Sequence, residues 1–215
     1  MNSIVKSILD ELNNSNIKNK KGQITCNLAG VTFYIDNRDI LGGIIQSWFG
    51  EWMSTKKIEW HAPANSQTWP DFTLKGGVHL EVKCFNYDEN PGFDIANFGS
   101  YVTSLLDVPQ RLNDDYIVFG YVFDGVNLSI KDYWVKHVWE LTGPSPTHFL
   151  NLQVKKGQAY NIRPKNWRGN GEIFQNRKDF VVALSKAVEK FGFGTANDWL
   201  NKVEKKFQAN TNSQL

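Results

Sequence analysis

The stretch Trp69–Phe85, WPDFTLKGGVHLEVKCF, predicts a β-hairpin, because two apolar runs flank a Gly-Gly pair that suits the positive φ angles of a tight turn. In the second run Glu81 and Lys83 are two residues apart, so both side chains point to one face of the strand. Val82 and Cys84 point to the other face, where they can pack. A carboxylate and an ammonium group thus interrupt a strand that is otherwise apolar.

Asp71 begins the first strand of this hairpin, and antiparallel pairing would bring Glu81 back beside it. Two adjacent carboxylates repel each other, and the pKa of one rises unless a cation lies between them. Mg²⁺ is a hard ion that binds oxygen atoms, so it would relieve this repulsion. The sequence therefore predicts a metal site formed by Asp71, Glu81 and the backbone carbonyl of Val82.

Lys83 would then contact a water molecule or a phosphate oxygen. Hydrolysis of a phosphodiester needs an activated water and a positive charge near the phosphate, and a metal ion with a lysine supplies both. Glu51, on an expected helix, could support the metal site from a distance. The alternative is that Asp71 is a turn residue, and that Glu81 and Lys83 form a salt bridge on the solvent face of a strand.

The rest of the chain predicts an α/β fold, with a central mixed sheet flanked by helices. Apolar residues at helical spacing predict helices over 3–13, 38–54, 95–106, 178–190 and 195–207. Strand-like patterns predict a hairpin over 23–35 and strands over 115–125, 147–154 and 158–162, with a strand or a strand-to-helix passage over 126–135. No repeat or linker divides the 215 residues, so we expect a single domain over 1–215.

Composition is that of a soluble globular protein, with 41% hydrophobic and 21% charged residues. No apolar run could span a membrane, and the N-terminal residues are unlike a signal peptide, so we expect a cytoplasmic protein. Cys26 and Cys84 lack metal-type spacing and are expected in the core. Residues 155–206 carry a net charge of +7 and the remainder −5, which predicts a basic surface for a polyanion or, alternatively, lysines that promote solubility.

The spacing Pro70-Asp71, nine residues, then Glu81-Val82-Lys83 resembles the PD-(D/E)XK nuclease superfamily, and the order of elements resembles the type II restriction endonucleases. More narrowly, WPDFTLKGG, LEVKCF, GFDIANFGSYVTSLL and DDYIVFGYVF are similar to the EcoRV and PvuII branch, although Glu81 stands where EcoRV has aspartate. The resemblance covers about residues 38–207.

This resemblance implies that Asp71 and Glu81 bind the metal and that Lys83 is the catalytic lysine. It implies a homodimer that uses Mg²⁺ to cut double-stranded DNA at a short palindromic site and leaves blunt ends. Within the blunt-cutting group, the chain also resembles enzymes that cut at GGNNCC. A structure-specific or DNA-repair nuclease of the same fold and a catalytically silent DNA-binding module are the alternatives. Two clustered carboxylates beside a polyanion argue against the silent module.

Two polar loops are expected to contact DNA. The loop at about 161–177 resembles the recognition loop of these enzymes in position, and its basic and amide side chains suit phosphates and base edges. Its candidate DNA contacts are Arg163, Lys165, Asn166, Trp167, Arg168 and Asn170. Its two glycines would let the backbone approach DNA. The loop at 62–68 corresponds to a minor-groove loop of the resembling enzymes and offers Asn65 and Gln67. An ordinary surface loop is the alternative in both places.

Overall fold

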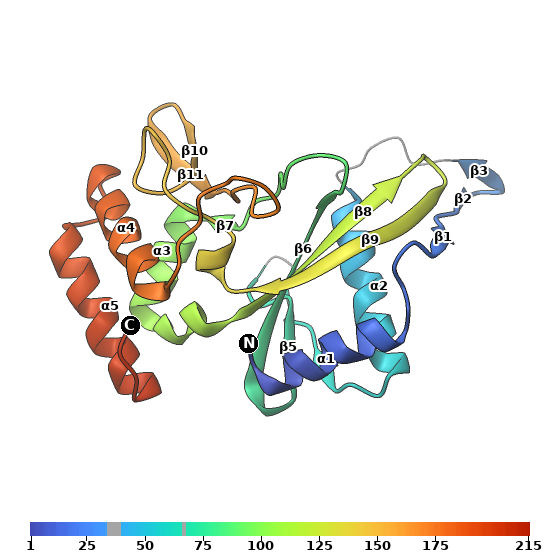
Figure 1. The fold of residues 1–215 in the computed structure, drawn as a ribbon, viewed down its shortest axis with the longest axis horizontal. Coiled ribbons are helices and arrows are strands. Elements are labelled where there is room, and N and C mark those ends of the chain that lie inside the picture. The colour runs from blue at the N-terminus through green and yellow to red at the C-terminus, as the bar shows by residue number, and fades with distance from the viewer. Residues whose placement is uncertain (34–39, 66–67) are drawn as a thin grey trace. The chain divides into compact units, whose positions relative to one another are not determined.

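The computed structural model describes residues 1–33, 40–65 and 68–215 and has the expected α/β fold, a mixed sheet flanked by helices (Figure 1). The chain forms two compact units. The first unit consists of Met1–Pro91 and Asp115–Lys136, and the second of Gly92–Asp114 and His137–Leu215. The expected single domain over 1–215 stays a prediction.

A six-stranded sheet in the first unit has the strand order β1-β9-β8-β6-β5-β4. β6 and β8 run parallel, and the other neighbours run antiparallel. The strands are β1 (Lys21–Gln23), β4 (Trp60–His61), β5 (Phe72–Leu74), β6 (Val78–Asn86), β8 (Asp115–Phe123) and β9 (Asn127–Lys136). β8 is buried along almost its whole length, as its continuous apolar sequence predicts. β9 is a strand throughout, so the strand-to-helix alternative is wrong.

Helices α1 (Ser3–Asn14) and α2 (Leu41–Thr55) pack their apolar sides with one face of this sheet into a single core. From β6, Leu80 and Val82 belong to that core. Because side chains alternate along a strand, Glu81 and Lys83 point to the opposite face. The helices expected over 3–13 and 38–54 are confirmed, except that positions 38 and 39 lie outside the described residues.

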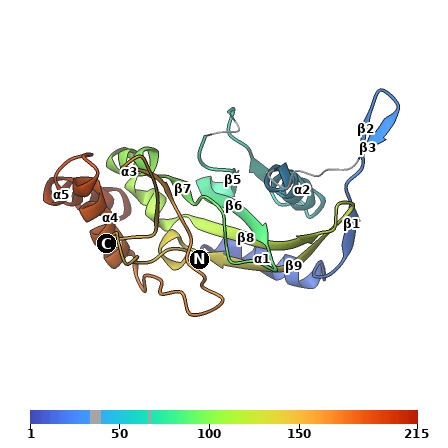
Figure 2. The same cartoon turned by 90° about the horizontal axis from the view of Figure 1, so that it is seen from above.

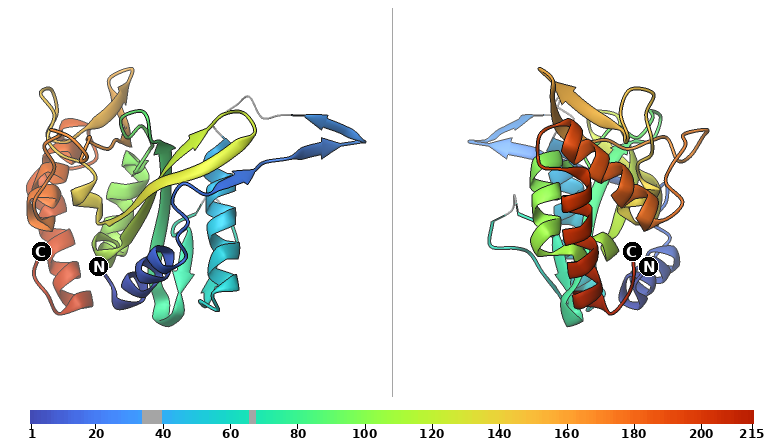
Figure 3. Two further views of the ribbon diagram at one scale, coloured as in Figure 1. Left: turned by 45° about the vertical axis from the view of Figure 1, so that its right-hand side comes forward. Right: turned by 90° about the vertical axis from the view of Figure 1, so that its left-hand side faces the viewer.

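A separate hairpin consists of β2 (Cys26–Leu28) and β3 (Val31–Phe33), which pair with each other and with no further strand in the described part of the chain. Ala29 and Gly30 form its turn with φ angles of 51° and 79°. Figures 2 and 3 show this ribbon projecting beyond the six-stranded sheet. The expected hairpin is confirmed, although its last two residues, 34 and 35, lie outside the described residues.

The second unit combines three helices with a small sheet of order β10-β11-β7. Its elements are β7 (Ala96–Asn97), α3 (Phe98–Asp107), β10 (Leu152–Lys155), β11 (Gln158–Ile162), α4 (Arg177–Lys190) and α5 (Ala196–Thr211). The strand expected over 147–154 is wrong in its first half. There the chain bends, because the carbonyl of His148 accepts hydrogen bonds from the backbone and hydroxyl of Ser145.

Both cysteines are partly rather than fully buried, which corrects the expectation that they are core residues. Each packs against the edge of the core, Cys26 from the hairpin and Cys84 from β6. Burial raises the pKa of the Cys84 thiol to about 11, so its thiolate is disfavoured at neutral pH. Within the described residues, no helix is long and apolar enough to cross a membrane.

Candidate active site

Asp71 and Glu81 meet where β5 begins beside β6. In the register of these strands Phe72 lies opposite Leu80, so the preceding position puts Asp71 opposite Glu81. The Oδ2 atom of Asp71 accepts a hydrogen bond of 2.7 Å from the backbone N–H of Val82. This bond continues the interaction between the two segments beyond the last strand pair and holds the carboxylate against β6.

Glu81 and Lys83 form an ion pair in which Lys83 Nζ lies 3.3 Å from Glu81 Oε2. The pair does not lie on a solvent face, because the side chains of Lys83 and Glu81 are 20% and 6% exposed. Burial and the nearby Glu81 carboxylate raise the pKa of Asp71 to about 6, while Lys83 and the N–H of Val82 oppose this rise. One ammonium group thus offsets part of the charge of two largely buried carboxylates.

Gln46 on α2 is a further member of the site that the sequence pattern did not reveal. Its Nε2 atom donates a hydrogen bond of 3.2 Å to Asp71 Oδ1, so both oxygens of the aspartate are held by N–H donors. The sequence pointed instead to Glu51 of the same helix, which is exposed. The available signal was a long polar side chain between Ile45 and Trp48, within the apolar sequence of the helix.

The oxygen atoms of Asp71 and Glu81 suit a hard divalent cation. Mg²⁺ is commonly bound by one or two carboxylates, with water and substrate phosphate as the remaining ligands. Residues 1–33, 40–65 and 68–215 contain no group of three His, Cys, Asp or Glu side chains that could hold a metal. A cation here would therefore need backbone, water or phosphate oxygens in addition to the two carboxylates. Mg²⁺ is commonly bound by such a mixture of oxygen ligands.

The loop at 161–177 is tied to the rest of the second unit at its beginning. Arg163 forms an ion pair with Asp94, and its guanidinium also donates to the carbonyl of Gly92. The carbonyl of Arg163 accepts a hydrogen bond of 2.9 Å from the hydroxyl of Thr142. Arg163 therefore has a structural role in this unit, and a contact with DNA would have to compete with Asp94.

The middle of the loop folds around Asn166. The carbonyl of Asn166 accepts hydrogen bonds from the N–H groups of Gly169 and Gly171. A Cβ atom at position 171 would lie 2.7 Å from backbone atoms of Asn166, which is too close for any side chain. Packing within the loop therefore accounts for Gly171 without a close approach to DNA. Trp167 packs edge-to-face against Phe93, with 6.0 Å between the ring centroids.

The remaining candidate DNA contacts differ in exposure. Lys165 and Arg168 are half-buried, whereas Asn170 and Asn65 are exposed. Gln67 lies outside the described residues. The DNA-binding roles of both loops stay predictions.

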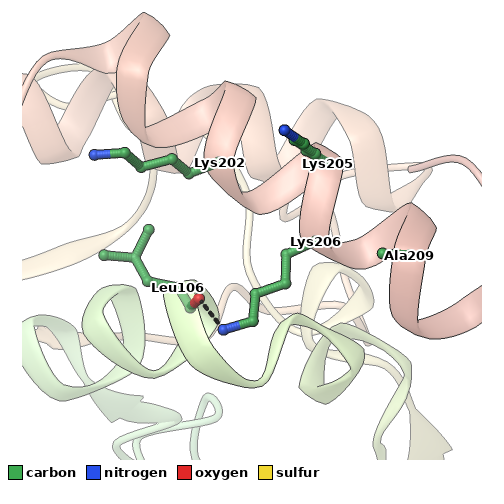
Figure 4. A pocket seen from close by; sticks show the side chains of 5 residues that line it. All are labelled: Leu106, Lys202, Lys205, Lys206 and Ala209. Atoms are coloured by element: carbon green, nitrogen blue, oxygen red, sulfur yellow. Dashed lines mark hydrogen bonds between the residues drawn. The ribbon is translucent and has the colours of Figure 1, made fainter.

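Lysines of α5 surround a hollow of about 400 Å³ beside Leu106 of α3 (Figure 4). Lys202 pairs with Asp198 at 2.8 Å, and Lys206 donates to the carbonyl of Leu106 at 2.9 Å. Lys206 also pairs with Asp107 at 3.4 Å, so carboxylates of the same unit balance part of the positive charge of the C-terminal segment. The expected basic surface for a polyanion stays a prediction.

Known proteins are similar to most or nearly all of this chain. A family model described as NgoBV restriction endonuclease matches residues 2–215. The type II restriction enzyme NlaIV of Neisseria lactamica is 36% identical over 223 residues, which cover 99% of this chain and 90% of that protein. The type II restriction enzyme NgoBV of Neisseria gonorrhoeae is 34% identical over 157 residues, covering 71% and 88% respectively. The solved structure of NlaIV restriction endonuclease matches with a TM-score of 0.88 at 35% identity, covering 98% of this chain and 90% of that one.

Proposed function

Because the chain belongs to the NgoBV restriction endonuclease family and is a type II restriction enzyme, we propose that it hydrolyses both strands of DNA at a short palindromic site, uses Mg²⁺ and leaves blunt ends. The observation that carries the proposal is the largely buried cluster of Asp71, Glu81 and Lys83 beside the start of β5. This cluster supports the cutting of DNA but does not indicate which sequence is cut, and GGNNCC is a candidate site because the chain resembles enzymes that cut there.

Asp71 and Glu81 would hold the Mg²⁺ ion together with the backbone carbonyl of Val82. In a strand the N–H and C=O of one residue point to the same side. The carbonyl of Val82 therefore points to the side on which its N–H meets Asp71. When bound, such an ion lowers the pKa of a bound water and neutralises charge on a phosphate. The partly exposed ammonium of Lys83 could orient the attacking water or stabilise the charge that develops on the phosphate.

Each chain contributes one set of Asp71, Glu81 and Lys83, whereas a double-strand break requires two hydrolysed bonds. We therefore propose a homodimer in which each copy cuts one strand. A palindromic target supports this arrangement, because its two half-sites have the same two-fold symmetry as such a dimer. Among the residues of the recognition loop, Lys165 and Asn170 are stronger candidates for reading DNA than Arg163, which is paired with Asp94.

Digestion of unmethylated phage DNA tests the proposed function. We expect discrete fragments with Mg²⁺, none with EDTA, and blunt ends at one fixed sequence, with GGNNCC as the candidate, when the termini are sequenced. A smear, or a preference for nicked or branched duplexes, would favour a structure-specific nuclease. Specific binding without cutting at any Mg²⁺ concentration would favour the silent module.

A further inference from the structure

The β2–β3 hairpin exposes an apolar face. Its register pairs Leu28 with Val31 and Cys26 with Phe33, so one face carries four side chains that are apolar or weakly polar. Leu28, Val31 and Phe33 are 72%, 64% and 46% exposed. A two-stranded ribbon alone is marginally stable in water, so a cover over this face would stabilise the hairpin.

The hairpin also lacks the features that usually protect an exposed strand edge. Residues 22–35 contain no Asp, Glu, Lys, Arg or Pro, in a chain of which 21% is charged. Soluble proteins commonly place charges or prolines on such edges, because unprotected edges associate with other chains. An uncharged, apolar and projecting ribbon is therefore suited to contact another protein surface.

An apolar cleft of about 450 Å³ opens in the same unit, beside the root of the hairpin. Its apolar walls come from the segments before β1 and β2, from α2 and from β9, and include Ile24, Ile44, Trp48, Trp52, Leu128 and Ile130. Ile24 lies two residues before β2, and none of the residues Cys26–Phe33 lines the cleft. Each chain thus carries a projecting apolar surface and, next to it, an apolar recess.

We propose that the hairpin of one chain inserts its apolar face into the cleft of a second copy, which inserts its own hairpin in return. The occupant is a second copy because one chain carries both complementary surfaces, and a two-fold axis would cover both with two equivalent contacts. The apolar face of the hairpin carries no charge. Two charged residues, Lys20 and Lys21, also line the cleft, and Lys20 Nζ donates a hydrogen bond to the carbonyl of Ser15. The inference rests on the proposed function, in which two copies supply the two active sites.

A charge placed on either face of the hairpin tests the contact. The double variant Leu28→Lys/Val31→Lys puts two ammonium groups on the apolar face, and Asn27→Lys/Thr32→Lys puts the same charges on the opposite face. All four positions are exposed, so circular dichroism should show that both variants fold. In sedimentation equilibrium, the wild type and the opposite-face variant should dimerise. The apolar-face variant should have a dimer dissociation constant at least tenfold higher, and an unchanged constant overturns the proposal.

Mixing two defective variants tests whether the cleft receives the hairpin. Ile44→Lys places a charge in the cleft, and this variant alone should dimerise poorly. A mixture of Ile44→Lys with Leu28→Lys/Val31→Lys should dimerise better than either variant, because the mixed pair keeps one contact with both sides intact. If the mixture associates no better than its components, the hairpin does not enter the cleft.

The failure of this interface can be distinguished from the failure of the proposed function. A wild type that cuts GGNNCC sites but stays monomeric, with and without uncleaved site DNA in Ca²⁺, overturns the interface and leaves the cutting activity in place. A wild type that dimerises through the hairpin but never cuts DNA supports the interface and contradicts the proposed function.

Discussion

Asp71 lies in an environment that favours its protonated form. Burial and the charge of Glu81 raise its pKa from 3.8 to about 6, although Lys83 and the N–H of Val82 favour the carboxylate. The folded protein therefore binds this proton more tightly than the unfolded chain does. The resulting stabilisation is complete below pH 3.8 and is lost as the pH rises through 6. The metal-free site is thus least stable at the pH at which two carboxylates are available for a cation.

Asp71→Asn should remove this loss of folding stability at high pH and at the same time abolish cutting. At pH 8 in EDTA the variant should be more stable than the wild type by about 1 to 3 kcal/mol, and the difference should shrink at pH 5. Urea unfolding at the two pH values measures it, with Asp10→Asn on the exposed side of α1 as the control for loss of one charge. If the variant and the wild type had equal free energies of unfolding at both pH values, protonation of Asp71 would not contribute to stability.

Lys83→Ala should lower the rate of DNA cutting by about a hundredfold or more, because one positive group near the phosphate is lost. Lys75→Ala is the matched control, since Lys75 is on the same hairpin but is 72% exposed and pairs with Glu59. Initial rates on a plasmid with one site measure both variants. Substantial cutting by Lys83→Ala would show that the reaction does not need this ammonium group.

Gln46→Ala should weaken the position of Asp71 without removing a ligand. We expect a rate about tenfold lower and a higher Mg²⁺ concentration at half-maximal rate, because one of two hydrogen bonds to the carboxylate is lost. Glu51→Ala, on the same helix, should leave both quantities unchanged. A reversed result would favour Glu51 as the residue that supports the site.

Sequence and structure agree on the strand residues of the site for a simple reason. The two-residue period of a strand determines that Glu81 and Lys83 share a face, and the Gly-Gly turn determines that Asp71 returns to Glu81. The position of Gln46 depends on how α2 is rotated and shifted over the sheet. That arrangement follows from packing in three dimensions and leaves no period in the sequence.

Among the elements, α2 connects the core to the site, and Gly50 lets this helix approach the strands closely. A Cβ atom at position 50 would lie 2.9 Å from the ring of Trp60 and 3.2 Å from that of Phe72. At Gly43 of the same helix, no atom lies within 4 Å of the corresponding position. Packing therefore requires a glycine at position 50 but not at position 43.

Gly43→Ala should stabilise the protein by up to about 1 kcal/mol, because alanine favours a helix more than glycine does. Gly50→Ala has the same benefit but overpacks the core, so it should be about 1 to 3 kcal/mol less stable than Gly43→Ala. Thermal or urea unfolding measures the difference. Equal stabilities would mean that Trp60 can move without cost.

The elements that the sequence missed are those without a usable pattern. β1 and β4 have three and two residues, too few to show alternation, and they are strands because longer neighbours pair with them. By contrast, seven of the nine residues of β8 are apolar or aromatic, and this sequence predicted a strand covered on both faces. The bend near His148 depends on hydrogen bonds from Ser145. The neighbouring apolar residues resemble a strand pattern, so the sequence does not reveal this bend.

For the whole molecule, family membership extends over residues 2–215, whereas the partner and the DNA sequence read by the loops stay proposals. Catalysis needs a few residue types at fixed spacing, which a sequence displays directly. Contact with a second copy needs a surface made of several residues. The β2–β3 hairpin is recognised as such a surface only from the structure, which places its exposed apolar side chains on a common face.

The division of work between two copies predicts how an inactive subunit affects cutting. After equilibration with a large excess of Lys83→Ala, most wild-type chains should be in mixed dimers that hydrolyse one strand. A supercoiled plasmid should then accumulate as the nicked circle, and linear product should fall with the square of the wild-type fraction. An excess of the variant Leu28→Lys/Val31→Lys/Ile44→Lys/Lys83→Ala should affect linear product much less, because neither its hairpin nor its cleft can form the contact with a wild-type chain. Linear product that falls only in proportion to the wild-type fraction would mean that one chain cuts both strands.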